Sequence, residues 1–204
     1  MTTKTTNQTR AEAVYDALRG EVLTARVPPA TKLKLADYSE RFDVSLSVVR
    51  EALSRLAEQG LIQANPQRGF STLPLSVDDL TDLTRARMVI ETGALRESIA
   101  HGDLAWESEV VAAQHRLAAT PLFDDDGSAN LDFGVVHRAF HIALLAGSGS
   151  AHLESIATGL RDRAELYLYW SRHLSDDTGR DIGCEHRRIA ELTIARDADQ
   201  ATEA

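Results

Sequence analysis

Three histidines have the residue type and spacing of a metal site. His137 and His141 lie four residues apart in a helical segment, so their imidazoles project from one face of the helix. His186, on a later predicted helix, can close the site. Imidazole ligands favour Zn or Ni over Mg or Ca. Two alternatives stay open: a polar ligand pocket without metal, and histidines with a purely structural role.

Two other side chains have chemistry that suits a small organic acid. The guanidinium of Arg87 can hold a carboxylate through two parallel hydrogen bonds. Arg87 also lies four residues before Glu91, and the alternative is an ordinary intrahelical ion pair worth about 0.2–0.5 kcal/mol. Tyr167 lies in the aromatic run ELYLYWSRHL, and aromatic residues in such a run pack in a core more often than they contact a ligand.

The segment VSLSVVREALSRLAEQGLIQANPQRGF has the residue types of a DNA-reading element. Ser45 can cap a helix and donate to a phosphate, because helix N-termini favour anions. Leu46, Ser47 and Arg50 follow in the first turns, where a recognition helix meets base edges, and Arg50 can read guanine. Arg68 at a hairpin tip can enter the adjacent minor groove. The predicted DNA contacts are Lys34, Ser45, Leu46, Ser47, Arg50, Arg68 and Gly69.

Apolar periodicity predicts the elements that position these groups. Helical spacing occurs in residues 11–24, again in 35–42, and in a helix that begins after Ser45 and ends at Gly60. The stretch 61–74 predicts two short strands around a turn. Helix, helix, turn, helix and hairpin is the order of a winged helix-turn-helix.

After a boundary at Pro74 and Ser76, the pattern is helical to the end of the chain. Ser76 to Asp79 is a capping box that opens the next helix. The predicted helices are 77–101, 104–119, 130–147, 150–174 and 181–196. The predicted fold is therefore mainly α: a winged helix-turn-helix DNA-binding domain at 1–75, followed by an all-helical effector-binding and dimerisation domain at 76–204.

Charge is distributed unevenly between these two parts. Residues 1–75 carry ten Lys and Arg against eight Asp and Glu, a net charge of +2, whereas the remainder has a net charge of -11. Phosphate binding needs local rather than total positive charge. No apolar run is long enough to span a membrane, and the single cysteine, Cys184, excludes an internal disulfide and a Cys-based zinc finger. These features fit the cytoplasm.

The DNA-reading segment closely resembles the corresponding part of the GntR family of bacterial regulators. The matching residues are Val44, Ser45, Val49, Arg50, Glu51, Ala52, Leu53, Leu56, Gly60, Leu61 and Gly69. Family members often carry Arg and a Thr-Pro pair after the serine, where this chain has Leu46, Ser47 and Val48. The departure implies a different operator, with Leu46 contacting a thymine methyl group or a sugar.

The second half resembles the all-helical FCD ligand-binding domain of the FadR-type subgroup. The resemblance is carried by Arg87–Glu91, His137–Leu144 and Glu185–Ala201. It implies that Arg87 points into a pocket and grips an effector carboxylate. It also implies that Tyr167 occupies a position that contacts the effector, although the Arg that relatives often have before this Tyr is Leu166 here.

The same resemblance implies a divalent metal held by an Asp and a His four residues apart and by two later histidines. His137 stands at the Asp position, and the last histidine would fall just beyond residue 204. Asp132 is a poor substitute, because five residues before His137 it points about 140° around the helix. At most three of the four expected ligands are present, namely His137, His141 and His186.

These patterns predict a homodimeric transcription regulator, usually a repressor in this family, whose affinity for double-stranded operator DNA responds to a small organic acid. Two alternatives stay open. A metal-dependent hydrolase is disfavoured because no carboxylate is predicted beside the histidines and no nucleophile motif is found. An architectural DNA-binding protein without an effector would have little use for an acidic helical domain.

Overall fold

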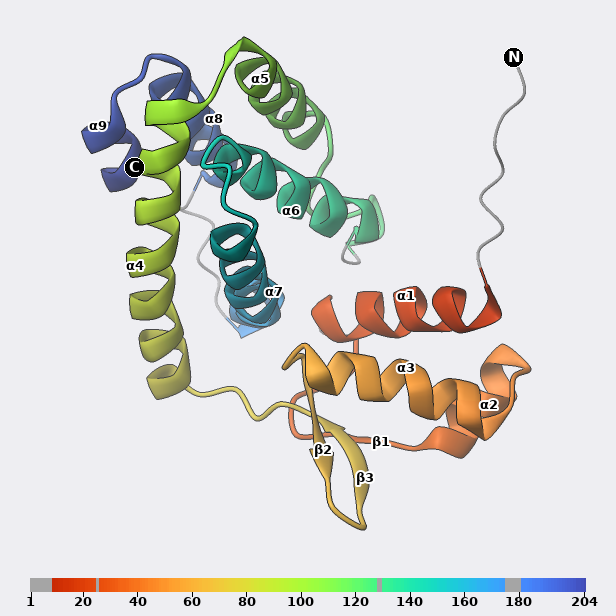
Figure 1. The fold of residues 1–204 in the computed structure, drawn as a ribbon. Coiled ribbons are helices and arrows are strands. Elements are labelled where there is room, and N and C mark those ends of the chain that lie inside the picture. The colour runs from red at the N-terminus through yellow and green to blue at the C-terminus, as the bar shows by residue number, and fades with distance from the viewer. Residues whose placement is uncertain (1–8, 25, 128–129, 175–180) are drawn as a thin grey trace. The chain divides into compact units, whose positions relative to one another are not determined.

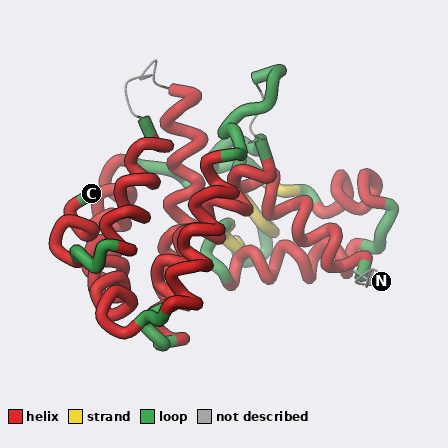
Figure 2. Tube along the Cα trace, turned by 90° about the horizontal axis from the view of Figure 1, so that it is seen from above, coloured by secondary structure: helices red, strands yellow, loops and turns green. Residues whose placement is uncertain are grey.

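The computed structural model describes residues 9–24, 26–127, 130–174 and 181–204. Its contacts divide the chain into two compact units, the N-terminal unit Met1–Leu75 and the C-terminal unit Ser76–Ala204, whose elements Figure 1 labels. Helices make up most of the described residues, among which strands occur only in the N-terminal unit (Figure 2). The prediction of a mainly helical protein is confirmed. Within those described ranges, no helix is long and apolar enough to cross a membrane.

The N-terminal unit is a winged helix-turn-helix, as predicted. Its elements are α1 (Arg10–Leu23), β1 (Lys32–Leu33), α2 (Leu35–Phe42), α3 (Leu46–Glu58), β2 (Ile62–Asn65) and β3 (Gly69–Thr72). The strands form an antiparallel sheet in the order β1-β3-β2, with Phe70 of β3 opposite both Leu33 and Ala64. Strand β1 was not predicted, because two residues are too few to show an alternating pattern.

A three-residue turn sets the direction of α3. Asp43 closes α2 in the left-handed backbone region, with φ at 50°, and Ser45 is the N-cap residue of α3. The apolar stripe of α3 is fully buried: Val49, Leu53 and Leu56. Because these positions follow helical spacing, the opposite side of α3, which carries Arg50, faces solvent.

The C-terminal unit consists of six helices over its described residues. They are α4 (Val77–His101), α5 (Leu104–Ala118), α6 (Leu131–Ala146), α7 (Ala151–Leu174), α8 (Ile182–Ile194) and α9 (Ala198–Glu203). The predicted cap is confirmed, since the Ser76 side chain accepts a hydrogen bond from the Asp79 N–H at 3.1 Å. Helix α9 was not predicted, because six residues are too short for a clear periodicity.

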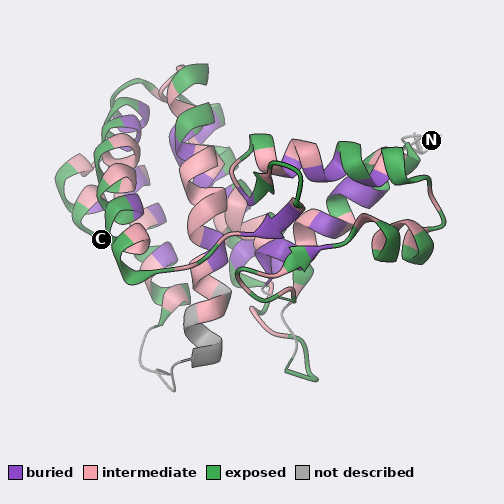
Figure 3. Cartoon of the chain, turned by 90° about the horizontal axis from the view of Figure 1, so that it is seen from below, coloured by how far each residue is buried: buried purple, intermediate pink, exposed green. Residues whose placement is uncertain are grey.

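The core of the C-terminal unit fixes the orientation of α6. Trp106 lies in a niche next to Gly102 and Gly147, where a Cβ atom would come within 2.1 Å and 2.8 Å of the indole ring. Its indole N–H donates to the carbonyl of Ala143 at 2.8 Å. In each unit, the buried residues lie on the inner faces of the helices (Figure 3). Phe140 is fully buried on α6, so the helix face that it shares with the neighbouring histidines points into the bundle.

Candidate DNA-binding surface and histidine centre

The predicted DNA-contacting residues of the recognition helix are exposed. Ser45, Leu46, Ser47 and Arg50 all face solvent at the N-terminal end of α3, and 52% of Leu46 is exposed. One detail differs from the prediction: the Ser45 side chain makes no capping hydrogen bond, and its hydroxyl lies 2.8 Å from that of Ser47. Ser45 therefore is the N-cap residue by position, but its hydroxyl faces that of Ser47 in the first turn of α3.

The predicted wing contact lies at the tip of the β2–β3 hairpin. Arg68 is exposed, and its backbone N–H donates to the Asn65 carbonyl at 3.0 Å. Gly69 has φ at 85°, a backbone conformation that a residue with a side chain rarely adopts. Lys34 is exposed at the start of α2 and lies 3.9 Å from Asp37, an exposed pair that contributes little to stability. Both cations are exposed on the surface of the N-terminal unit.

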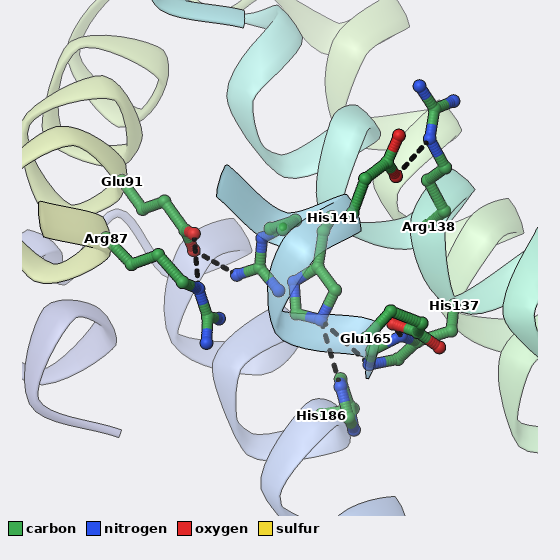
Figure 4. Close-up of polar contacts among 9 residues, drawn as sticks. Arg87, Glu91, His137, Arg138, His141, Glu165 and His186 are labelled. Carbon is green, nitrogen blue, oxygen red and sulfur yellow. Dashed lines mark hydrogen bonds and ion pairs between the residues drawn. The ribbon is translucent and has the colours of Figure 1, made fainter. Parts of the chain in front are cut away.

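Helices α6 and α8 bring the three predicted histidines together. The His141 Nε2 atom lies 3.2 Å from His137 Nε2 and 3.1 Å from His186 Nε2. Figure 4 shows the three rings pointing at a common centre. His141 and His186 are buried, and 13% of the His137 side chain is exposed. The sequence-predicted cluster is thus brought together, although the two helices are separated by 45 residues between His141 and His186.

The outer nitrogens of two histidines are held by acceptors. His137 Nδ1 lies 3.1 Å from Glu165 Oε2, and His186 Nδ1 lies 2.6 Å from the carbonyl of Ile182. A ring that donates through Nδ1–H keeps an unprotonated lone pair on Nε2. Burial lowers the pKa of His141 well below its usual value, and the nearby Arg161 lowers it further. Burial, then His137, lowers the pKa of His186 to about 4. Burial therefore keeps His141 and His186 neutral at neutral pH, and the Nε2 atoms of the three rings converge.

This arrangement fits a divalent metal ion. Unprotonated Nε2 atoms at these distances repel one another unless a proton or a cation lies between them. Two tetrahedral zinc ligands, each about 2.0–2.1 Å from the ion, are about 3.3 Å apart, close to the separations of the Nε2 atoms. The carboxylate beside His137 Nδ1 and the carbonyl beside His186 Nδ1 are the partners that metal-bound histidines usually have, whereas the buried Nδ1 of His141 has no hydrogen-bond partner among the described residues. The set His137, His141 and His186 therefore has the chemistry of three ligands.

A partly buried cluster of charged groups lies on α4 and α7. Arg87 Nε donates to Glu91 Oε1 at 2.9 Å, and the Arg161 guanidinium makes a second ion pair with the other Glu91 oxygen. Burial lowers the pKa of Arg161 to about 10 despite Glu91, and its Nε has no hydrogen-bond partner. Because both Arg161 and Arg87 lower the pKa of His141, this cluster and the histidines share one electrostatic environment. Arg87 thus makes the ion pair that the sequence allowed, and its predicted role toward an effector stays a prediction.

Sequence reasoning missed Glu165 and Arg161. The expectation that no carboxylate lies beside the histidines is wrong, since Glu165 contacts His137. A signal was present: 161 and 165 continue the helical stripe of the buried Ala157, and charges on a buried stripe are exceptional. The identity of their partners, however, depends on how α7 packs against α4 and α6.

Tyr167 lies on a different side of α7 from Glu165. Its hydroxyl donates to Asp79 Oδ2 at 2.6 Å, and Arg163 pairs with the other Asp79 oxygen at 3.1 Å. The Ser76 N–H lies 3.4 Å from the same hydroxyl. Tyr167 therefore contacts the first turn of α4, and its predicted contact with an effector stays a prediction.

A pocket of about 270 Å3 adjoins the histidines. His186 lines it, as does Phe133, whose ring stacks on that of His137 with centroids 5.3 Å apart. The remaining lining comes from the C-terminal end of α5, the segment after it, and the start of α8. The centre therefore has a neighbouring space that can admit part of a small molecule.

An exposed recognition helix with a wing, and a separate helical unit built around a polar centre, define a class of DNA-binding transcription regulators. Residues 10–71 match the bacterial regulatory proteins of the gntR family, and residues 82–204 match the FCD domain. The chain belongs to the GntR family and carries an FCD domain. Among its relatives is the HTH-type transcriptional regulator BphR of Paraburkholderia xenovorans, 33% identical over 94% of this chain and 79% of that protein.

Other comparisons agree with this assignment. The HTH-type transcriptional repressor GlaR of Escherichia coli is 29% identical over 93% of this chain and 87% of its own length. The E. coli McbR/YncC structure shares the fold with a TM-score of 0.75 at 18% identity, covering 96% of this chain and 91% of the other. A putative GntR regulator from Rhodococcus has a TM-score of 0.69 at 25% identity, over 95% and 90%. Because these relatives are transcription regulators, the hydrolase alternative is wrong.

Proposed function

We propose that this regulator is a cytoplasmic, homodimeric repressor whose affinity for operator DNA is controlled by a small carboxylate. The carboxylate binds in the C-terminal unit, at a divalent metal held by His137, His141 and His186. The observation that carries this proposal is the convergence of three Nε2 atoms, since His141 Nε2 lies 3.2 Å from His137 Nε2 and 3.1 Å from His186 Nε2. The name of the relative GlaR, a repressor, supports the direction of regulation.

Each group near the centre has a distinct task in this proposal. A bound Zn or Ni supplies fixed positive charge that attracts a carboxylate. Glu165 orients His137, and the Ile182 carbonyl orients His186. Arg87 uses Nε for Glu91, while a guanidinium has five N–H donors, so its terminal nitrogens suit a carboxylate. Glu91 pairs with both Arg87 and Arg161 and so keeps both cations near the histidine centre.

The DNA-binding side follows from the exposed residues of the N-terminal unit. Two copies would place their α3 helices in successive major grooves, about 34 Å apart on a pseudo-palindromic site. Arg50 reads a base edge, Arg68 enters the minor groove, and Lys34, Ser45 and Ser47 contact the backbone. Leu46 contacts a thymine methyl group or a sugar, and Gly69 lets the wing backbone approach. Effector binding shifts the population between dimer arrangements with different affinities for the operator.

The test is a titration of DNA binding and of melting temperature with a panel of mono- and dicarboxylic acids. The DNA is a duplex selected by the protein from a random-sequence pool, and the protein is loaded with zinc. We expect one acid to change operator affinity by about 5- to 150-fold. At a hundredfold excess over its dissociation constant, the acid should also add about 2.7 kcal/mol of stability. Chelator treatment should abolish both effects.

A matched pair of variants tests whether the response to the acid needs the Arg87 side chain itself or only the positive charge on α4. Arg87→Ala should abolish the response to the acid, whereas Arg85→Ala, exposed on the same helix, should leave it intact. A response that survives chelation but needs Arg87 would point to the polar pocket without metal. Operator affinity that no acid and no chelator changes would contradict the effector part of the proposal and leave an architectural DNA-binding protein.

A further inference from the structure

We infer that the effector is a monocarboxylate whose uncharged tail, about the size of a phenyl ring or a five-carbon chain, occupies the pocket beside His186. We name this space the α5–α8 pocket. It is lined by α5 and the residues after it, by Phe133 at the start of α6, and by the first turn of α8. The inference rests on the proposed function, because the carboxylate is taken to lie at the histidine centre.

The pocket and the histidine centre are adjacent and share two residues. His186 belongs to both, since its Nε2 faces His141 while its side chain lines the pocket. Phe133 also belongs to both, because it lines the pocket and stacks on His137 at an interplanar angle of 16°. A ligand that places its carboxylate at the Nε2 atoms therefore has this pocket as a neighbouring space for its remaining atoms.

The size of the pocket limits the tail. Its volume of about 270 Å3 lies just below the roughly 300–1,000 Å3 of typical ligand pockets. Most of the lining is apolar, with Leu117, Leu122 and Ile182 joining Phe133. Burial of apolar atoms there favours binding in proportion to the apolar area removed from water. A short hydrocarbon or aromatic tail fits in this space and gains affinity there.

The charge of the lining decides against a second carboxylate. Among the lining residues, all of them within the described ranges, Asp181 is the one carboxylate and there is no Lys or Arg. Asp181 also compensates the positive end of α8, because its side chain accepts from the Cys184 N–H at 2.9 Å. A second carboxylate in the tail would therefore lie near a negative charge, with no cation among the lining residues to pair with.

Two neutral polar side chains in the pocket determine which polar group the tail can carry. Gln114 and Thr120 also line the pocket. The Thr120 hydroxyl donates to the Arg116 carbonyl at 2.9 Å, which leaves its oxygen lone pairs able to accept. One hydroxyl or carbonyl on the tail is compatible with these groups, and a charged one is not.

The experiment compares hexanoate with adipate on the zinc-loaded full chain by calorimetry. The two acids have six carbons each and differ only in whether the far end is a methyl group or a carboxylate. Benzoate is the third probe. We expect hexanoate or benzoate to bind at least about tenfold more tightly than adipate. Asp181→Asn keeps a side chain that can cap α8 but removes the negative charge from the pocket. It should therefore reduce the difference in affinity between adipate and the monocarboxylates.

Two neighbouring alanines give a variant and its control. Ala118 lines the pocket and is exposed, so Ala118→Leu should fill the space, leave the fold intact, and weaken hexanoate or benzoate binding by about tenfold. Ala119 is exposed but does not line the pocket, so Ala119→Leu should leave the affinity unchanged.

The outcomes distinguish the inference from the proposed function. Adipate binding as tightly as hexanoate, or hexanoate affinity that Ala118→Leu does not change, overturns the inference and leaves the proposed function in place. If no carboxylate binds while zinc and DNA still bind, both the inference and the effector part of the proposed function are overturned.

Discussion

The α3 surface and the histidine centre solve opposite problems of recognition. On α3, Arg50 stays exposed, because phosphates and base edges arrive from outside and displace counterions. At the histidine centre, Arg161 and His141 are held inside the bundle, and their pKa values fall because burial disfavours the charged form. The polar groups of the α3 surface stay hydrated, so they cost little folding free energy. The polar groups of the histidine centre lose their hydration when the C-terminal unit folds, which costs folding free energy.

This difference has a consequence for how each region responds to substitution. A change on the exposed surface should alter binding and leave stability unchanged. A change at the buried centre should alter both, because each polar group there supports another. Glu91, for example, pairs with both Arg87 and Arg161. A substitution that removes the Glu91 carboxylate would leave both guanidinium groups without this ion-pair partner, which lowers the stability of the C-terminal unit.

The largest effect is expected on the exposed surface. Arg50→Ala should weaken binding to the selected duplex by about 1–3 kcal/mol, or about 5- to 150-fold, because it removes a contact to a base edge. Its melting temperature should stay within error of the unchanged protein, since the side chain is exposed. Fluorescence anisotropy and thermal unfolding measure the two quantities.

Arg116→Ala is the matched control for Arg50. Arg116 is an Arg of the C-terminal unit with 56% of its side chain exposed, and removing it changes the net charge equally. Equal losses of affinity for the two variants would show that total charge, and not the recognition helix, governs DNA binding. A marked loss of stability in Arg50→Ala would break the comparison between the regions.

At the buried centre, Glu165→Gln should lower zinc affinity by about tenfold, because the neutral amide orients His137 less strongly than the carboxylate. Competition with a chelator measures this affinity. Glu191→Gln, exposed on the helix that carries His186, should leave zinc affinity unchanged. Zinc affinity that stays the same in Glu165→Gln would show that Glu165 does not position the metal ligand.

The same contrast explains what could be predicted from the sequence. The winged helix-turn-helix was predictable because short-range spacing and a long family match both lie within one segment. The pair His137 and His141 was predictable because four residues of helix fix their common face. Glu165 lies 28 residues from His137, and no local spacing determines that distance. Such partners follow from the packing of whole helices, which the sequence pattern alone does not specify.

The smallest effect is expected at Tyr167. Burial raises the pKa of its hydroxyl and the hydrogen bond to Asp79 raises it further, so the group stays protonated and donates. Tyr167→Phe removes this bond and should cost about 1 kcal/mol, because Arg163 still pairs with Asp79 and keeps the carboxylate satisfied. A fall in melting temperature of about 2–4 °C with unchanged carboxylate affinity would show that Tyr167 stabilises the start of α4 and does not contact the effector. Weaker carboxylate binding at unchanged melting temperature would instead place Tyr167 in contact with the effector, as the family resemblance implies.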